Sequence, residues 1–370
     1  MESYATDLLT ALAVVMNGVP QGLLSLSLGF AAFPTAIAFL IGAAGSFAFN
    51  SVATISFQAE TIAVAGKLGS TPRERMSLVF WGALFLLIPS SLGLNEKIVE
   101  LIGPVIVNAM MAGVGVMLAL VSIDMLEAEK YSGISSMAVA LATWFITFDL
   151  AKTVIISVIA ATIVFNILKK HGKVEAQDLC VDESRERLTL GNIEWKIWKY
   201  PKIIVSGLAL ACLNIGANIS FGKITGSIAN TSANIDHLAI YSSLADMGST
   251  FFGGGPVEAI ISGTATAPHP VGASILMMLI MAAILLFKLL PVLGRYVHSA
   301  AISGFLFVLG VFVTFISNIQ VAISLAPAAQ GPFGFSPWGM AIGATVIVSA
   351  RWNPFYGLLA GVAIKLIFGL

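Results

Sequence analysis

The stretch Leu244-Ala-Asp-Met-Gly-Ser-Thr-Phe-Phe-Gly-Gly-Gly-Pro-Val-Glu-Ala-Ile-Ile-Ser-Gly-Thr-Ala-Thr-Ala-Pro268 decides the fold of this chain, because a Gly-Gly-Gly-Pro break interrupts an apolar region. A lipid bilayer offers an open backbone no hydrogen-bond partners, so such a break requires surrounding protein or a wet cavity. Pro256 suits the first turn of a new helix, which places Glu258 near free N–H groups. A half-helix beside a lone carboxylate is typical of midplane transporter sites; the alternative is a glutamate that only stabilises its helix start.

The composition is that of a polytopic helical membrane protein. Of the 370 residues, 58% are hydrophobic and 10% are charged, and apolar runs long enough to span a bilayer recur along the chain. The net charge is zero, and we expect no nucleic-acid partner. The two cysteines supply neither a disulfide framework nor a metal set, and the sequence has no nucleophile motif or phosphate-binding glycine loop. We therefore expect no metal, no cofactor and no enzyme activity.

A second break lies in the first half of the chain. The apolar segments 34–49 and 55–66 are too close together to be two full spans joined by a solvated loop. We therefore expect residues 50–60 to run extended before a half-helix begins.

The two halves of the chain match at an offset of roughly 190 to 200 residues, as internal repeats of transporters do. Asn17 and Gln21, four apart, correspond to Asn214 and Asn218, and Glu60 corresponds to Glu258. Any single match could arise by chance, because small and polar residues also recur where helices pack.

These observations predict an all-α polytopic membrane protein of about 14 transmembrane segments. Residues 1–168 and 201–370 would be two inverted seven-segment repeats, joined by a polar linker over residues 169–200. Each repeat would contain a short extended piece before a half-helix. Core and gate domains would each be built from both repeats.

Polar side chains inside apolar segments are costly, so each is a functional hypothesis. If the half-helices meet at the midplane, amides, a carboxylate and an aromatic face converge there and suit a flat polar ring. The candidate substrate-binding residues are Glu258, Gln58, Phe57, Asn214, Gly255 and Val257. Glu258 and Glu60 are candidates for carrying a coupling proton. Asn17, Gln21 and Asn218 are supporting polar residues, which equally suit hydrogen bonding between helices.

Three motifs resemble those of a known family. Leu213-Asn-Ile-Gly-Ala-Asn-Ile-Ser-Phe-Gly-Lys-Ile-Thr-Gly226, Phe251-Phe-Gly-Gly-Gly-Pro256 and Gly103-Pro-Val-Ile106 with Gly113 are similar to the eighth, tenth and fifth segments of the nucleobase–cation symporter family, the xanthine/uracil permeases. The resemblance implies fourteen segments in inverted repeats, with substrate between the third and tenth half-helices. The sequence departs from the family at Leu213 and Asn214, where the family has an acid and a histidine. Only Glu258 could replace that acid.

We therefore predict a secondary active transporter for proton-coupled uptake of a nucleobase, with a purine such as xanthine, guanine or hypoxanthine favoured over uracil. Sodium is the other candidate coupling ion. One alternative is an anion carrier that resembles the sulfate permease family, because paired half-helix dipoles would hold an anion. Another is a non-transporting membrane scaffold or receptor. We expect a multi-pass protein of the cell (inner) membrane, with the lipid bilayer and a small-molecule substrate as partners and a homodimer as one assembly.

Overall fold

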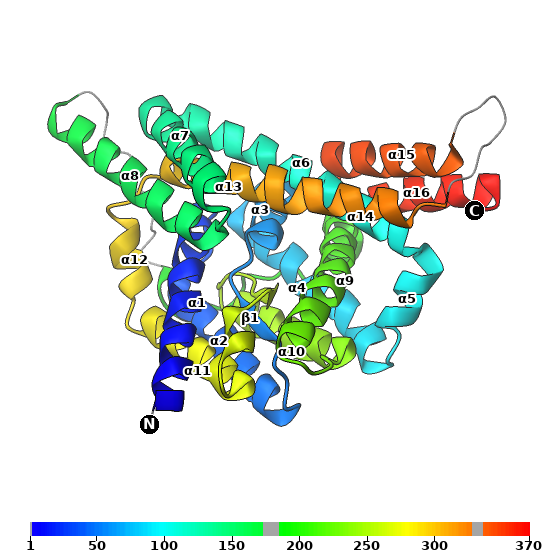
Figure 1. Ribbon diagram of the computed structural model, residues 1–370, viewed down its shortest axis with the longest axis horizontal. Coiled ribbons are helices and arrows are strands. Elements are labelled where there is room, and N and C mark those ends of the chain that lie inside the picture. The colour runs from blue at the N-terminus through cyan, green and yellow to red at the C-terminus, as the bar shows by residue number, and fades with distance from the viewer. Residues whose placement is uncertain (1, 173–184, 328–335) are drawn as a thin grey trace.

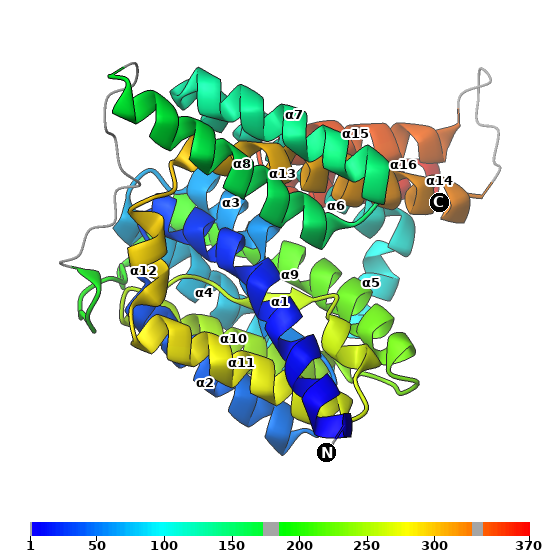
Figure 2. The same ribbon diagram turned by 60° about the vertical axis from the view of Figure 1, so that its left-hand side comes forward.

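The computed structural model describes residues 2–172, 185–327 and 336–370, and this part of the chain is mostly helical. Figure 1 shows two layers, a lower one that contains a small sheet and an upper one that consists of helices. We call them the strand layer and the helix layer. In Figure 2, α7 and α8 again lie above α1, α2 and α11, so the separation of the layers holds in both views.

The strand layer is assembled from segments of both halves of the chain. It consists of α1 (Glu2–Ser27), α2 (Ala32–Ala48), β1 (Thr54–Ser56), α3 (Ala59–Leu68), α4 (Pro72–Ser91), α9 (Pro201–Ile228), α10 (Ile235–Phe251), β2 (Glu258–Ile260), the 3-10 turn η3 (Gly263–Thr266) and α11 (Pro270–Leu286). Helices α2 and α11 pack against each other, as do α4 and α9.

The helix layer also draws on both halves. It consists of α6 (Pro104–Ala128), α7 (Lys130–Thr147), α8 (Leu150–Lys170), η4 (Ser299–Ile302), α13 (Ser303–Val308), the π-helix η5 (Leu309–Ile316), α14 (Ser317–Leu325), α15 (Pro337–Arg351) and α16 (Pro354–Phe368). Two short helices connect the layers at their sides, α5 (Asn95–Ile102) and α12 (Leu289–Gly294).

Membrane insertion follows from the length and hydropathy of the helices. Within the described residues, α1, α6, α8, α9 and the run Ser299–Leu325 are long and apolar enough to cross a bilayer, and α4 with α5 forms one more candidate that bends by 100°. The chain is therefore a multi-pass membrane protein. The expected 14 segments are not reached by this criterion, because helices such as α2, α11 and α16 have only 15 to 17 residues.

The two breaks predicted from the sequence meet in an antiparallel ladder. Strand β1 pairs with β2 in the register Thr54↔Ile260, Ile55↔Ala259 and Ser56↔Glu258. The ladder provides the backbone hydrogen bonds that lipid could not, so two short strands are stable inside the protein. As expected, the extended first piece leads into a short helix, α3.

The second break differs from the prediction, because no helix begins at Pro256. Val257 donates its N–H to Asp246 Oδ1 at 2.7 Å, and Glu258 is a strand residue instead of a helix-start residue. After β2 only the four-residue turn η3 follows. Pro268 explains why η3 is short, because a proline disfavours helical backbone in the preceding residue. Ala267 is accordingly extended, with ψ 153°.

The Gly-Gly-Gly-Pro break itself is fixed by packing. Gly253 has φ +101°, a conformation that residues with a Cβ rarely adopt, and its carbonyl accepts the N–H of Ala31 at 3.0 Å. At Gly254 a Cβ would lie 2.6 Å from the backbone nitrogen of Thr35. The glycines therefore let the end of α10 approach the start of α2 closely.

The described end of the linker is attached to the strand layer. Glu186 is 4% exposed and accepts the N–H groups of Ala32 at 2.9 Å and Phe33 at 2.8 Å, so it caps α2. Asn192 donates to the carbonyl oxygen of Phe251 at 3.1 Å. The remainder of the predicted linker, residues 173–184, lies outside the described residues.

Candidate functional site

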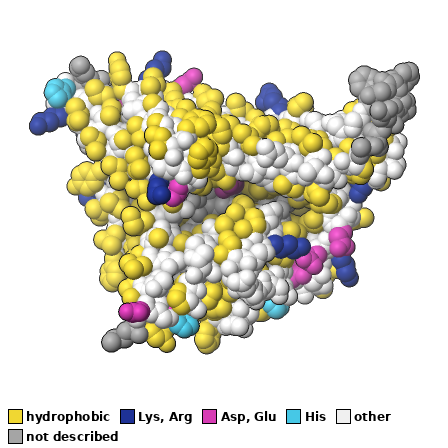
Figure 3. Space-filling model, in the orientation of Figure 1, with side chains coloured by type: hydrophobic (Ala, Val, Ile, Leu, Met, Phe, Trp, Pro, Cys, Tyr) yellow, Lys and Arg dark blue, Asp and Glu magenta, His cyan; other side chains and the backbone are white. Residues whose placement is uncertain are grey.

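A cavity of about 110 Å³ lies between the two layers and contains several of the polar residues predicted from the sequence. Its polar lining comes from the strand layer, and its far wall is apolar and includes Leu150 of α8 and Leu309 and Val313 of η5. The polar lining residues are Asn17, Gln21, Ser56, Gln58 and Glu60. Figure 3 shows a hollow between the layers with an acidic side chain inside it. We call this cavity the interlayer pocket.

The start of α3 faces the interlayer pocket. Gln58 is the N-cap residue of α3, and the first N–H of the helix, that of Ala59, donates to Gln21 Oε1 at 3.0 Å. Because the peptide dipoles of a helix add up, its N-terminal end attracts negative charge. Gln58 Nε2 and Ser56 Oγ are buried and have no hydrogen-bond partner among the described residues. Both can therefore donate to a solute in the pocket.

Glu60 joins the two layers at the edge of the pocket. Its side chain is 5% exposed, and its Oε1 accepts the hydroxyl of Thr314 in η5 at 3.2 Å. A π-helix is rare and is often found at functional sites. Among the described residues, no lysine, arginine or histidine lines the pocket. Glu60 is therefore the titratable group of this lining.

A line of polar contacts runs from the pocket into the strand layer. The hydroxyl of Thr61 lies 2.6 Å from Gln58 Oε1 and 3.1 Å from Asn214 Oδ1. Asn214 Nδ2 in turn donates to Glu258 Oε1. Glu258 is 1% exposed and does not line the pocket itself. The structure thus places Gln58 at the pocket and connects it, through Thr61 and Asn214, to Glu258.

Of the other predicted site residues, Phe57 belongs to the lining, and Gly255, Val257 and Asn218 do not. Phe57 lines the pocket and packs edge-on against Phe39. Gly255 is held by Thr35, whose Oγ1 accepts the Gly255 N–H at 2.8 Å, and Val257 is fully buried. Asn218 is fully buried one turn after Asn214, and neither atom of its amide has a described partner. Gly255 and Val257 therefore shape the break and do not line the interlayer pocket.

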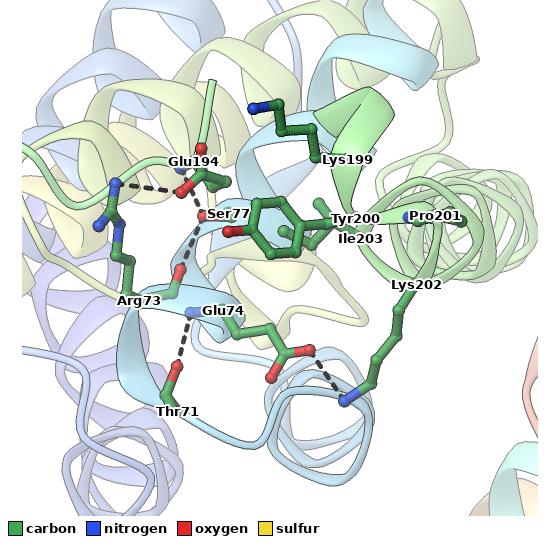
Figure 4. A pocket seen from close by; sticks show the side chains of 10 residues that line it. All are labelled: Thr71, Arg73, Glu74, Ser77, Glu194, Lys199, Tyr200, Pro201, Lys202 and Ile203. Atoms are coloured by element: carbon green, nitrogen blue, oxygen red, sulfur yellow. Dashed lines mark hydrogen bonds and ion pairs between the residues drawn. The ribbon is translucent and has the colours of Figure 1, made fainter. Parts of the chain in front are cut away.

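A larger cavity of about 470 Å³ lies at the surface, between the start of α4 and the end of the linker. Figure 4 shows two ion pairs among its charged side chains, Arg73 with Glu194 at 3.3 Å and Lys202 with Glu74 at 2.8 Å. The 3-10 turn η2 (Ile197–Lys199) borders it. None of the site residues predicted from the sequence lines this cavity. The pair of Arg73 and Glu194 attaches the linker to α4, and the pair of Lys202 and Glu74 joins α9 to α4.

Sequence reasoning missed three residues of the site, and it also did not select Asp246, which lies in the strand layer outside the pocket. Ser56 and Thr61 are ordinary polar residues in the sequence, and only the fold shows that they face the pocket and Asn214. Thr314 lies in an apolar helix of the second half, without any local signal. Asp246 carried a signal, because it is an ionisable residue in an apolar segment.

Comparison with known proteins supports the fold. No protein-family model and no curated protein sequence matches the chain. Among solved structures, the transmembrane domain of a cyanobacterium bicarbonate transporter, BicA, matches with a TM-score of 0.65 and 16% identity over 97% of both chains. SLC26A9 matches with a TM-score of 0.73 and 12% identity, over 100% of this chain and 65% of that one. At such identities the similarity establishes the fold alone.

A further match is the murine Solute Carrier 26 family member A9 anion transporter in its inward-facing state, with a TM-score of 0.67 and 14% identity, over 98% of this chain and 68% of that one. By their printed names, BicA is a bicarbonate transporter and the murine Solute Carrier 26 family member A9 is an anion transporter. The predicted relationship to the nucleobase–cation symporter family is therefore wrong, and so is the prediction of nucleobase uptake. The motifs behind it are short glycine- and proline-containing runs, which report how the backbone breaks and say little about the solute.

Proposed function

We propose that this chain carries a small anion across the membrane together with a proton, and that the interlayer pocket is the anion site. The arrangement that carries the proposal is the start of α3 beside two unpartnered donors, Gln58 Nε2 and Ser56 Oγ. A helix start with free donors favours a negative charge. The names of the structural neighbours support the same class of solute.

Because the carboxyl group of Glu60 lies at the pocket, binding of an anion there would require that Glu60 be protonated. An anion in a pocket of about 110 Å³ would lie close to this carboxyl group, and no basic side chain of the described lining offsets its charge. Two negative charges at such a distance repel each other strongly where water is scarce. Anion binding is therefore favoured when Glu60 is protonated. The anion and this proton would move across the membrane together.

Movement would occur between the two layers. We propose that the strand layer acts as the core and the helix layer as the gate, and that residues 1–168 and 201–370 form two inverted repeats around residues 169–200. In the first half β1 is followed by α3, and at the corresponding place in the second half β2 is followed by η3. This order supports the two repeats. The bond between Glu60 and Thr314 crosses the boundary between the layers, so protonation of Glu60 would alter the contact at which they must separate.

The test is uptake of labelled bicarbonate, sulfate, chloride and small carboxylates into reconstituted vesicles. We expect the wild-type protein to accumulate one of these anions and an inward proton gradient to accelerate the uptake. The variant Glu60→Gln should keep anion binding but lose the acceleration, whereas Glu127→Gln, at an exposed position of α6, should behave as wild type. Full proton-driven accumulation by Glu60→Gln would exclude the proposed coupling. Absence of flux for every anion would instead favour a non-transporting protein.

A further inference from the structure

Two carboxyl groups lie against each other inside the strand layer, away from the interlayer pocket. They belong to Asp246 in the last turns of α10 and to Glu258 in β2, and each residue is 1% exposed. Neither lines the pocket. Asp246 is thus a packed interior residue and not a solvated helix-end residue.

Each carboxyl group is held by one oxygen and leaves the other without a partner. Asp246 Oδ1 accepts the N–H of Val257 at 2.7 Å, and Glu258 Oε1 accepts the amide of Asn214. Asp246 Oδ2 and Glu258 Oε2 have no hydrogen-bond partner among the described residues. Buried acceptors without partners are rare and costly, so these two carboxyl groups call for a bound proton or cation.

A third buried and unpartnered group belongs to α9, the helix that carries Asn214. Asn218 is on the same side of α9 as Asn214 and Thr225, because Asn218 follows Asn214 by four positions and Thr225 follows it by eleven. Asn214 contacts Glu258, and Thr225 donates to the carbonyl oxygen of Ile260 at 3.2 Å, so this side of α9 faces β2. The amide of Asn218, fully buried and unpartnered, therefore faces β2 between these two contacts.

No described basic side chain compensates the pair. Of the elements that pack against α10 and β2, α2 and β1 contain no ionisable residue. Lys202 and Lys223, at the two ends of α9, are paired with Glu74 and Glu96. The other ionisable groups on the packed elements are Arg73 and Arg75 of α4, Lys97 and Glu100 of α5, Cys212 of α9, and Asp236, His237 and Tyr241 of α10. Tyr241 donates its hydroxyl hydrogen to the carbonyl oxygen of Ala53 at 2.6 Å.

We propose that Asp246 and Glu258 share one proton and form a second proton-binding site, separate from the interlayer pocket. A proton on one carboxyl group lets that group donate to the other and leaves the pair with a single negative charge, whereas two adjacent carboxylates without water or a cation would repel each other. The charged member is stabilised by Val257 N–H and the Asn214 amide. The site does not depend on the identity of the transported solute or on transport.

The pair can nevertheless influence the pocket, because Asn214, Thr61 and Gln58 connect them. When the shared proton leaves, Glu258 accepts more strongly from Asn214, and the amide of Asn214 is held in one orientation. Thr61 must then donate to Asn214 Oδ1 and release Gln58 Oε1, because a hydroxyl has one hydrogen. The orientation of Gln58 would thus depend on the state of the pair.

Infrared spectroscopy of the purified full-length protein, without any transported anion, tests this proposal, since a protonated carboxyl group has its own C=O band that shifts in D2O. The variant D246N/E258Q should lose the band of one carboxyl group at neutral pH. Loss of two bands would mean two independently protonated acids, and loss of none would mean that both are ionised; either result overturns the proposal. The matched control E60Q should leave the band of the pair in place.

A measurement on the wild-type protein covers the case in which the double variant does not fold. Labelling aspartate or glutamate with 13C identifies the band without any substitution, and raising the pH should remove it while the melting temperature falls, because the folded state binds a proton that the unfolded state does not. Replacing choline chloride by sodium chloride at fixed pH should leave the band unchanged. Its disappearance would show that sodium occupies the site and would overturn the proposal.

Discussion

At the scale of single residues, Asp149 shows how one side chain organises a helix start near the pocket. It is the N-cap residue of α8, and its Oδ1 accepts the N–H of Lys152 at 3.1 Å. The Lys152 ammonium group lies 3.2 Å from Asp149 Oδ2. The hydrogen bond from the Lys152 backbone, together with the ammonium group, lowers the pKa of Asp149. The next residue, Leu150, belongs to the pocket wall.

This lowered pKa predicts a loss of stability in acid. Because the folded state favours the ionised form, Asp149 stabilises the protein above its unfolded pKa of about 3.9, and this contribution disappears as the pH falls through the lower folded value. Asp149→Ala should lower the free energy of unfolding by about 1 kcal/mol at neutral pH, as loss of an N-cap does. Thermal unfolding between about pH 2 and pH 7 measures both effects.

Asp149→Asn is the matched variant, since asparagine caps a helix about as well as aspartate. It should remain close to wild type at neutral pH but lose the part of the acid sensitivity that Asp149 contributes. Equal acid sensitivity in wild type and Asp149→Asn would show that Asp149 does not contribute to it.

The residues of the site were more predictable than their contacts. Asn17, Gln21, Gln58 and Glu60 line the interlayer pocket, and the sequence points to them because polar groups inside apolar segments stand out. Their partners did not stand out. Thr314 is one threonine among many, and its bond to Glu60 joins residues that the sequence gives no reason to pair.

At the scale of elements, the π-helix η5 depends on a close approach to α6. At Gly310 a Cβ would lie 2.7 Å from the carbonyl oxygen of Gly115 and 2.9 Å from the backbone nitrogen of Ala119. Both contacts are with backbone atoms, which cannot move aside as a flexible side chain could. The glycine therefore determines how deeply η5 packs and where Thr314 meets Glu60.

Gly310→Ala should destabilise the protein by about 1–3 kcal/mol, because the added methyl group forces η5 away from α6. Gly343→Ala is the matched control in another helix of the same layer. A Cβ there meets nothing within 4 Å, so this change should be neutral or stabilising by up to about 1 kcal/mol. Thermal unfolding of both variants measures the difference. Equal stability of the two would mean that the approach of η5 to α6 is not tight.

The predicted half-helices show why only one of the two elements was correct. For α3 the segment from Ala59 to Leu68 contains no proline, and nothing interrupts the helix that the sequence favours. In the second half, Pro256 suits a helix start equally well as a bend into a strand, and pairing with β1 decided the outcome. Such pairing joins distant parts of the chain and has no local signature in the sequence.

At the scale of the whole molecule, the linker is attached to three helices of the strand layer, at the start of α2, at the end of α10 and in the middle of α4. Glu186 caps α2, Asn192 holds the carbonyl oxygen of Phe251 at the end of α10, and Trp81 of α4 donates its Nε1 hydrogen to the carbonyl oxygen of Glu194 at 3.0 Å. The sequence predicts a polar linker here. Its described part contains one 3-10 turn and a set of side-chain anchors.

Glu186→Ala should lower the free energy of unfolding by about 2 kcal/mol, because one buried and one partly buried N–H group at the start of α2 lose their acceptor. Glu186→Gln keeps one acceptor oxygen and should cost less. Glu100→Ala, at an exposed position of α5, serves as the control and should have little effect. Chemical or thermal unfolding measures the order of the three variants. A Glu186→Ala protein as stable as the control would exclude a structural role for this cap.

The ladder between β1 and β2 also has a consequence for biogenesis. Strand β1 is synthesised about 200 residues before β2, which at roughly 5–20 residues per second corresponds to a delay on the order of ten to forty seconds. During that interval the nascent chain has an unsatisfied strand edge in an environment without water. The first half cannot mature alone, so the insertion machinery must shelter it until the ribosome has delivered the second half.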